Sequence, residues 1–221
     1  MPIRTRYEKQ LQEIISKLTQ MCRLVELAIE KSVKALIKRD HELAQEVCDG
    51  DKQIDEMERE IEQACLKILV MEHPVASDFR EISTALKMIT DLERIGDQAR
   101  DIAEITLLFP DEKYIRKLEH IPQMATIAIQ MVKDGVQAYI NHDLKLARAL
   151  RKVDDEVDAL FDTIKTDLTE LLKTNPDYAE QAILFMMIAK YLERIGDHAG
   201  NISEWVEYAI TGKHHKSYDN I

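Results

Sequence analysis

Apolar residues recur along the chain in alternating steps of three and four, the spacing of a helix that buries one face against other helices. The first segment shows this spacing without a break, at Leu11, Ile15, Leu18, Cys22, Val25 and Ile29. Glycine and proline interrupt the pattern at few places. It therefore predicts an all-α protein whose long helices cover about residues 6–39, 40–72, 77–108, 121–140, 143–173 and 178–210.

Residues that start or stop a helix support these bounds. Asp40 precedes the second helix, where its carboxylate can accept hydrogen bonds from free backbone N–H groups. A proline pushes the residue before it out of the helical region, so Pro74 and Pro176 each end a helix. Gly212 supplies a left-handed stop for the last helix. A turn of helix from Asp111 could precede the fourth helix, and the pattern leaves this open.

The hexapeptide Leu-Glu-Arg-Ile-Gly-Asp occurs twice, at residues 92–97 and 192–197. Around it, residues 91–104 match residues 191–204 at nine of fourteen positions. A second signature, Asp-x-x-Leu-Ala, recurs at a separation of 103 residues. The chain is therefore a tandem duplication. We predict two three-helix bundles and a polar tail, over residues 1–110, 111–212 and 213–221.

Composition narrows the classes of function. Charged residues make up 32% of the 221 residues, aromatic residues 5%, and the net charge is −11, which argues against a nucleic-acid binder. No apolar run approaches the roughly 20 residues that span a bilayer, and no apolar core follows the basic N-terminus. We therefore expect no membrane segment and no secretory signal. The three cysteines lack CxxC spacing, as expected for reduced, buried thiols in a cytoplasmic protein.

Pairs of carboxylates form the candidate site. Glu93 and Asp97 are four residues apart and so share one helix face, as Asp51 and Asp55 do on the preceding helix. If these helices form a hairpin that turns at Pro74, Asp55 and Glu93 each lie 19 residues from the proline. Asp51 and Asp97 each lie 23 residues from it. The same count in the second half brings together Asp154, Asp158, Glu193 and Asp197.

Four like charges at one height repel one another unless a cation neutralises them. Carboxylate oxygens suit hard cations such as Mg²⁺, Mn²⁺, Ca²⁺ or Fe³⁺, so each cluster is a candidate metal site. The alternative is an ordinary solvated acidic face, since Arg94 and Arg194 lie beside the carboxylates. No glycine-rich phosphate loop, nucleophile elbow or Cys/His pair indicates covalent catalysis.

Two apolar stripes run along the third helix. The first, repeated 100 residues later, is the expected core face and consists of Met88, Leu92, Ile95, Ala99 and Ile102. The second begins as Phe79, Ile82, Leu86 and Ile89 and continues into Glu93, Gly96 and Arg100. We therefore expect the carboxylates on an outer face or groove, which weighs against a buried ferritin-like di-iron site. The second stripe would serve dimerisation or packing between the halves.

Glycine is unfavourable inside a helix, and Gly96 and Gly196 lie between the acids of both repeats. Their position indicates either that something approaches the backbone closely there or that helices pack closely. The two copies differ in the next turn, where His198 replaces Gln98. We interpret His198 as a surface residue.

The doubled hexapeptide, the Asp-x-x-Leu-Ala signature and Asp78-Phe79-Arg80 together resemble the PhoU family over essentially the whole chain. The resemblance implies two similar three-helix bundles and a cytoplasmic regulator of phosphate uptake. It also implies association with a Pst-type phosphate importer and with the sensor histidine kinase of the phosphate response. Some members of the family carry multinuclear iron or zinc clusters at their Glu/Asp-x-x-x-Asp motifs.

By this resemblance, the matching metal positions are Glu93, Asp97, Glu193 and Asp197, with Asp51, Asp55, Asp154 and Asp158 as facing partners. Asp101 continues the first site by one turn, whereas the second repeat has Asn201, so full equivalence is not expected. The leading hypothesis is a non-enzymatic, homodimeric regulator that contacts the importer's ATPase and the kinase and binds iron, zinc or another cation. The alternatives are a carboxylate-rich metalloenzyme and a metal-free helical adaptor similar to a co-chaperone.

Overall fold

The computed structural model describes residues 3–109, 114–115 and 119–213. Within these ranges the chain forms long α-helices and one short 3-10 helix, and no strand. The elements are α1 (Ile3–Lys38), α2 (His41–Glu72), α3 (Ser77–Leu108), α4 (His120–Asn141), α5 (Leu144–Thr174), η1 (Pro176–Tyr178) and α6 (Ala179–Thr211). Each helix expected from the hydrophobic pattern is present, and the all-α fold class is confirmed.

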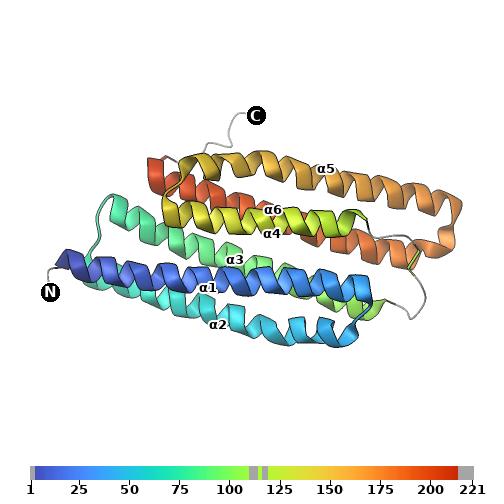
Figure 1. Ribbon diagram of the computed structural model, residues 1–221, viewed down its shortest axis with the longest axis horizontal. Coiled ribbons are helices and arrows are strands. Elements are labelled where there is room, and N and C mark those ends of the chain that lie inside the picture. The colour runs from blue at the N-terminus through green and yellow to red at the C-terminus, as the bar shows by residue number, and fades with distance from the viewer. Residues whose placement is uncertain (1–2, 110–113, 116–118, 214–221) are drawn as a thin grey trace.

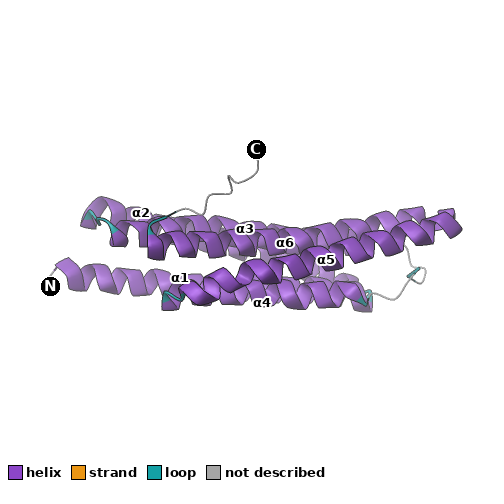
Figure 2. Ribbon diagram, turned by 90° about the horizontal axis from the view of Figure 1, so that it is seen from above, coloured by secondary structure: helices purple, strands orange, loops and turns teal. Residues whose placement is uncertain are grey.

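The helices form two three-helix bundles that lie side by side, α1 to α3 in one and α4 to α6 in the other (Figure 1). Helices α3 and α6 pack against each other and join the bundles. Seen at right angles, α2, α3, α6 and α5 make one layer, and α1 and α4 make the second (Figure 2). One continuous cluster of buried apolar side chains runs through both repeats. The two bundles therefore share a single core.

The helix ends have the expected chemistry. The Asp40 side chain accepts a hydrogen bond from the Leu43 N–H at 2.9 Å, and Asp143 accepts one from Leu146 at 2.9 Å. Both aspartates thus cap helices that begin at equivalent places of the two repeats. Gly212 ends α6 with a φ of 70°, the left-handed stop that the sequence predicts.

Three bounds differ from the prediction. Helix α1 begins at Ile3 rather than near Arg6, because its first turns are held by an Arg6–Glu72 ion pair of 2.8 Å and by burial of Tyr7. Asp143 is the cap of α5 and not part of it, and η1 precedes α6. Most of the turn expected from Asp111 falls outside the described residues. The described residues 114–115 are not helical.

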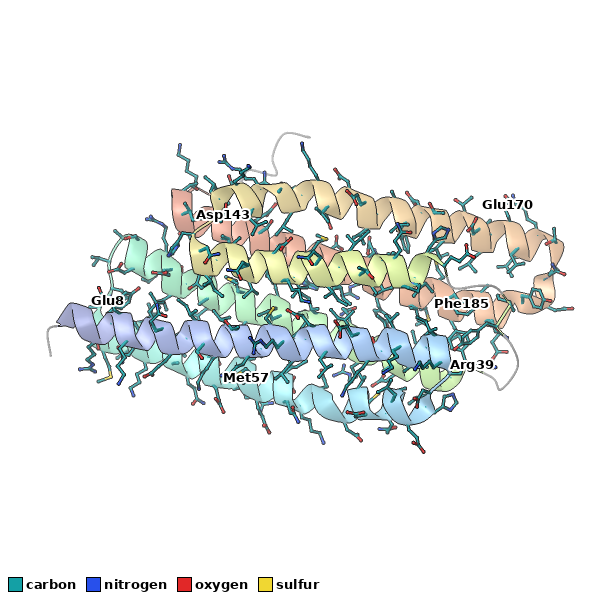
Figure 3. All side chains as sticks on the ribbon, in the orientation of Figure 1. Glu8, Arg39, Met57, Asp143, Glu170 and Phe185 are labelled. Carbon is teal, nitrogen blue, oxygen red and sulfur yellow. The ribbon has the colours of Figure 1, made fainter. Side chains whose placement is uncertain are left out.

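An aromatic cluster packs beside the connection between the repeats. The ring of Phe185 lies 4.8 Å from that of Phe109 and 5.3 Å from that of Tyr114, centroid to centroid. The Tyr114 hydroxyl donates to the Leu36 carbonyl at 2.7 Å, and Arg39 stacks over the Tyr114 ring. Figure 3 shows Phe185 and Arg39 at the same end of the molecule. This cluster ties the second bundle to the end of α1.

Two smaller expectations can be compared with the structure. Cys22 and Cys65 are buried free thiols as predicted, whereas Cys48 is only partly buried. Across the described ranges, no helix is both long enough and apolar enough to cross a membrane.

Candidate functional site: two acidic clusters between paired helices

The first acidic cluster lies where α2 packs against α3. The Nη1 atom of Arg100 is 2.5 Å from Oδ2 of Asp51 on α2 and 2.9 Å from Oδ1 of Asp97 on α3. Two carboxylates from two helices therefore meet at one nitrogen, as the count from Pro74 predicts. Burial raises the pKa of Glu93, and the charges of Asp97 and Asp55 add to this rise. The four predicted residues of the first repeat are thus neighbours.

Arginine side chains neutralise much of this first cluster. Beyond Asp51 and Asp97, the Arg100 guanidinium lies 3.7 Å from Asp101 and 3.5 Å from Glu104. Arg94 adds a second guanidinium at the rim, 3.0 Å from Asp97 and 3.4 Å from Glu93. The Arg100–Asp51 and Arg94–Asp97 contacts are charge-assisted hydrogen bonds, which are roughly twice as strong as neutral ones. The first cluster is therefore a closed network of ion pairs.

The first cluster lies in a groove between two helices, which is one of the two locations that the sequence left open. The side chains of Asp51, Asp97 and Glu93 are only 9%, 17% and 19% exposed, so they lie in the seam between α2 and α3 and not on an open outer face. The end of the second stripe faces α2 of the same repeat, because Arg100 pairs with Asp51 there. The prediction that the apolar part of the stripe serves dimerisation or packing between the halves stays a prediction.

The mid-helix glycines are sites of close helix packing. A Cβ atom added at Gly96 would lie 2.9 Å from the Ile54 side chain of α2. At Gly196 it would lie 3.2 Å from Asp154 Oδ1 and 3.3 Å from Val157 Cγ1 of α5. Of the two interpretations left open by the sequence, the structure shows close helix packing at both glycines.

The second cluster repeats the carboxylates but not the arginine. Asp154 and Asp158 on α5 face Glu193 and Asp197 on α6, and the charges of these three neighbours all act on Asp154. The position equivalent to Arg100 is Gly200, which lies 100 residues later. A Cβ added there would be 3.7 Å from Asp154 Oδ2, so the Asp154 carboxylate lies over bare backbone.

A lysine lies at the rim of the second cluster. Lys190 pairs with Glu193 at 2.5 Å, within the same helix. Burial, together with the charges of Asp158 and Asp197, raises the pKa of Asp154 to about 6. At Asp51 burial also raises the pKa, but the hydrogen bond and charge of Arg100 counteract the rise. The two clusters therefore differ in the charge that faces the equivalent aspartates: Arg100 faces Asp51 of α2, and neighbouring carboxylates face Asp154 of α5.

Whether these residues fit a metal depends on the repeat. Among the described residues, no group of three or more His, Cys, Asp or Glu side chains is placed to hold an ion without rearrangement. The first cluster does not fit a cation, because Arg100 already lies between its carboxylates. The second has the oxygen-only donor set of a hard-cation site, and Gly200 places no side chain beside the Asp154 carboxylate. Its side chains would have to turn inward to bind an ion.

The differences between the two hexapeptide regions lie at the contact of α3 with α6. His198 Nδ1 is 2.9 Å from Oδ1 of Asp91, and the Asn201 side chain donates to the same oxygen at 3.3 Å. Asp101 faces the Tyr191 hydroxyl, whose hydrogen bond lowers the pKa of Asp101 against the larger rise caused by burial. The interpretation of His198 as a surface residue was wrong, because its side chain is only 20% exposed.

Two residues of the first cluster were missed from sequence. Arg100 was noted only as part of a stripe, although comparison with Gly200 marks it as the main difference between the sites. Glu58 adds a further carboxylate, and burial together with the charge of Glu62 raises its pKa. Its equivalent in the second repeat is Phe161, over whose ring the Lys190 ammonium lies at 5.5 Å. The repeats have therefore diverged in charge at several positions.

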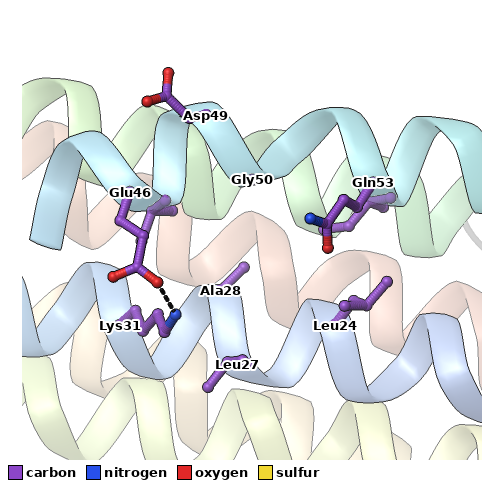
Figure 4. Close-up of a pocket in the computed structure, with 10 residues that line it drawn as sticks. Leu24, Leu27, Ala28, Lys31, Glu46, Asp49, Gly50 and Gln53 are labelled. Carbon is purple, nitrogen blue, oxygen red and sulfur yellow. Dashed lines mark hydrogen bonds and ion pairs between the residues drawn. The ribbon is translucent and has the colours of Figure 1, made fainter.

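A separate groove of about 300 Å³ lies between α1 and α2. Leu24, Leu27 and Ala28 of α1 line it, and Figure 4 shows the Lys31–Glu46 ion pair of 2.5 Å across one end. Gly50 of α2 lines the same groove, and no atom lies within 4 Å of where its Cβ would be. The groove contains none of the predicted site residues.

The fold and the two clusters define a class: internally duplicated, all-helical proteins with an acidic Glu-x-x-x-Asp motif in the last helix of each bundle. The PhoU domain matches twice, at residues 18–106 and 121–206. The chain therefore belongs to the PhoU family, as the motifs of the sequence predict.

Similar proteins cover nearly the whole chain. A phosphate-specific transport system accessory protein PhoU homolog of Clostridium acetobutylicum is 36% identical over 208 residues, which are 94% of this chain and 95% of that protein. PhoU homolog 1 of Thermotoga maritima is 34% identical over 213 residues, 96% of this chain and 92% of that protein.

Solved structures agree with the fold. The crystal structure of PhoU from Pseudomonas aeruginosa has a TM-score of 0.89 at 33% identity and covers 94% of this chain and 100% of that one. The phosphate transport system regulatory protein PhoU from Streptococcus pneumoniae has a TM-score of 0.87 at 25% identity, with 95% and 99% coverage. The arrangement of two fused bundles is thus shared with both.

Proposed function

We propose that the protein is a cytoplasmic regulator of phosphate uptake and of phosphate-responsive signalling. The observation that carries the proposal is the family match in both repeats. Relatives that match over more than nine-tenths of this chain are named phosphate-specific transport system accessory proteins. The protein would act without catalysis, by contact with the ATPase of a Pst-type phosphate importer and with a phosphate-sensing histidine kinase.

Exposed apolar side chains on the layer of α1 and α4 support a contact role. Leu27 and Ile37 of α1 are 45% and 47% exposed. Ile37 lines a shallow groove of about 310 Å³ together with Val33 and, from α4, Ile129. Val33, Ile37 and Ile129 thus gather in one groove, and exposed apolar side chains that lie together in this way mark protein contact sites. The layer is therefore the surface that we propose for docking of the importer's ATPase. The homodimer would form through another face of the protein.

The experiment is a pull-down of the importer's ATPase and of the histidine kinase with the purified, tagged protein, at high and at low phosphate. We expect both partners to be retained, with phosphate changing the amount of kinase retained. Leu27→Asp with Ile37→Asp should reduce retention of the ATPase, whereas Arg23→Ala, at an exposed position of α1, should not. Retention of neither partner under either condition would overturn the proposal.

We further propose that the acidic site binds an iron, zinc or other divalent or trivalent cation. The four carboxylates of the second cluster and the missing arginine support this. A bound cation would neutralise these carboxylates and link α5 to α6. Elemental analysis of protein purified without chelator should find metal, and Glu193→Gln with Asp197→Asn should lower its amount. Metal-free protein that retains both partners would support the metal-free adaptor instead.

A further inference from the structure

The two repeats differ most clearly, within their acidic sites, at the residue three positions after the motif aspartate. The first repeat has Arg100 after Asp97, and the second has Gly200 after Asp197. In the first repeat this residue connects two helices, because one guanidinium nitrogen contacts both Asp51 of α2 and Asp97 of α3. In the second repeat no side chain can do so from this position.

We infer that Arg100 takes the place of a bound cation in the first acidic cluster, so that cation binding in this chain is confined to the second cluster. The statement about the second cluster rests on the metal binding proposed above. The statement about the first cluster stands on the ion pairs of Arg100 alone.

The geometry of the arginine supports this assignment. Hard cations bind carboxylate oxygens at about 2.0–2.6 Å, so a bridging ion between Asp51 and Asp97 would occupy the space in which the guanidinium lies. Its Nη1 atom is already within 2.5 and 2.9 Å of one oxygen of each aspartate. A guanidinium keeps its charge at any physiological pH and presents five donors in a fixed plane. Arg100 is therefore a permanent counter-ion, which a metal would have to displace.

The remaining basic residues do not explain the difference between the clusters. Arg94 has an exact counterpart in Arg194, and its own side chain is 55% exposed at the rim. Lys190 is present only in the second repeat, where it pairs with Glu193 of the same helix and lies over the Phe161 ring of α5. Its side chain is 51% exposed, so it lies at the rim and, among the described residues, forms no ion pair with an α5 carboxylate. The residue at position 100 or 200 thus decides whether a fixed positive charge lies between α2 and α3 or between α5 and α6.

The experiment counts bound Mn²⁺ per chain by equilibrium dialysis and electron paramagnetic resonance on the full-length protein after chelator treatment. With Arg100 in place, we expect the Asp154→Asn variant to bind no Mn²⁺. The Asp51→Asn variant should bind as much as the parent protein. Arg100→Gln should add at least one Mn²⁺ per chain, and the added ion should disappear when Asp51→Asn is combined with it. Arg94→Gln, which removes the same charge from the rim, should add none.

Loss of Mn²⁺ from the single variant Asp51→Asn would overturn the inference. An Arg100→Gln variant that binds no more Mn²⁺ than the parent protein would overturn it as well. If the second cluster binds no metal, the parent protein binds no Mn²⁺. Arg100→Gln should then still add Mn²⁺ at the first cluster, so the failure of the proposed metal binding can be told apart from the failure of this inference. The converse variant Gly200→Arg keeps the test usable if Arg100→Gln unfolds. It should abolish Mn²⁺ binding at the second cluster, and unchanged binding would contradict the inference.

Discussion

The Nδ1 atom of His198 lies 2.9 Å from Oδ1 of Asp91, and this contact joins α6 of the second repeat to α3 of the first. The same oxygen accepts a hydrogen bond from Asn201. The equivalent positions are exchanged elsewhere along the same contact, where Asp101 of α3 accepts a hydrogen bond from the Tyr191 hydroxyl of α6. Residues that differ between the repeats are thus matched across the α3–α6 contact. The duplicated helices have diverged so that each complements the other.

Asp91→Ala should therefore lower the free energy of unfolding by about 1–3 kcal/mol, because His198 and Asn201 lose the acceptor that they share. Urea unfolding followed by circular dichroism measures this change. Thr90→Ala is a matched control, since Thr90 is the exposed neighbour of Asp91 on α3. Equal unfolding midpoints for the two variants would contradict a structural role for the Asp91 contact.

Hydrophobic periodicity predicts which faces of a helix are buried but does not say what covers them. Leu92, Ile95 and Ile102 of the first stripe are fully buried, as expected. The second stripe was predicted to serve dimerisation or packing between the halves, and the contact of its polar end with α2 does not test this prediction. A contact within the repeat and a contact with the other half or with a second copy both use residues at helical spacing. The spacing of apolar residues alone therefore does not distinguish between them.

The candidate site was predicted in part for a similar reason. Counting residues from Pro74 placed Asp51 and Asp97 at one height, because two helices in a hairpin advance at the same rise per residue. The count treats each residue as a point on its helix. It does not say which neighbour a long side chain reaches, so the bridge from Arg100 to α2 became visible only in the structure.

Two glycines of the first bundle should respond in opposite directions to alanine. Gly50 lies inside α2 with nothing within 4 Å of an added Cβ, so Gly50→Ala should stabilise the protein by about 0.5–1 kcal/mol through lower chain entropy. At Gly96 the Cβ would lie 2.9 Å from Ile54, so Gly96→Ala should destabilise it by about 1–3 kcal/mol. Thermal unfolding of both variants, side by side, gives the two signs. A stabilised Gly96→Ala would show that α2 and α3 can separate without loss.

The aromatic cluster at the connection between repeats should matter for stability. Phe185 is 2% exposed and contacts the rings of Phe109 and Tyr114. Phe185→Ala should lower the free energy of unfolding by about 3–5 kcal/mol, because it removes a large buried side chain and leaves a cavity. Ile183→Ala, at a 58% exposed position of the same helix, should change it little. A small effect of both would mean that the cluster is loosely packed.

The charge on Asp154 should destabilise the metal-free protein at neutral pH. Burial and neighbouring carboxylates raise the pKa of Asp154 from 3.8 to about 6, so the folded state binds this proton more tightly than the unfolded state. The penalty is then fully present above pH 6 and decreases as the pH falls from 6 towards 3.8. Asp154→Asn removes the charge and should stabilise the protein at pH 8 by on the order of 1 kcal/mol, after allowance for partial exposure to water.

Urea unfolding of the protein and of Asp154→Asn, both in chelator, tests this between pH 8 and pH 4. The gain in stability from the substitution should shrink as the pH falls through 6, because Asp154 of the unchanged protein then becomes neutral in the folded state. Asp155→Asn removes the same charge one residue away at an exposed position, and its effect should be small at every pH. A gain from Asp154→Asn that stays constant across this range would locate the titrating group elsewhere, and a loss of stability at pH 8 would mean that the charge of Asp154 is favourably paired in solution.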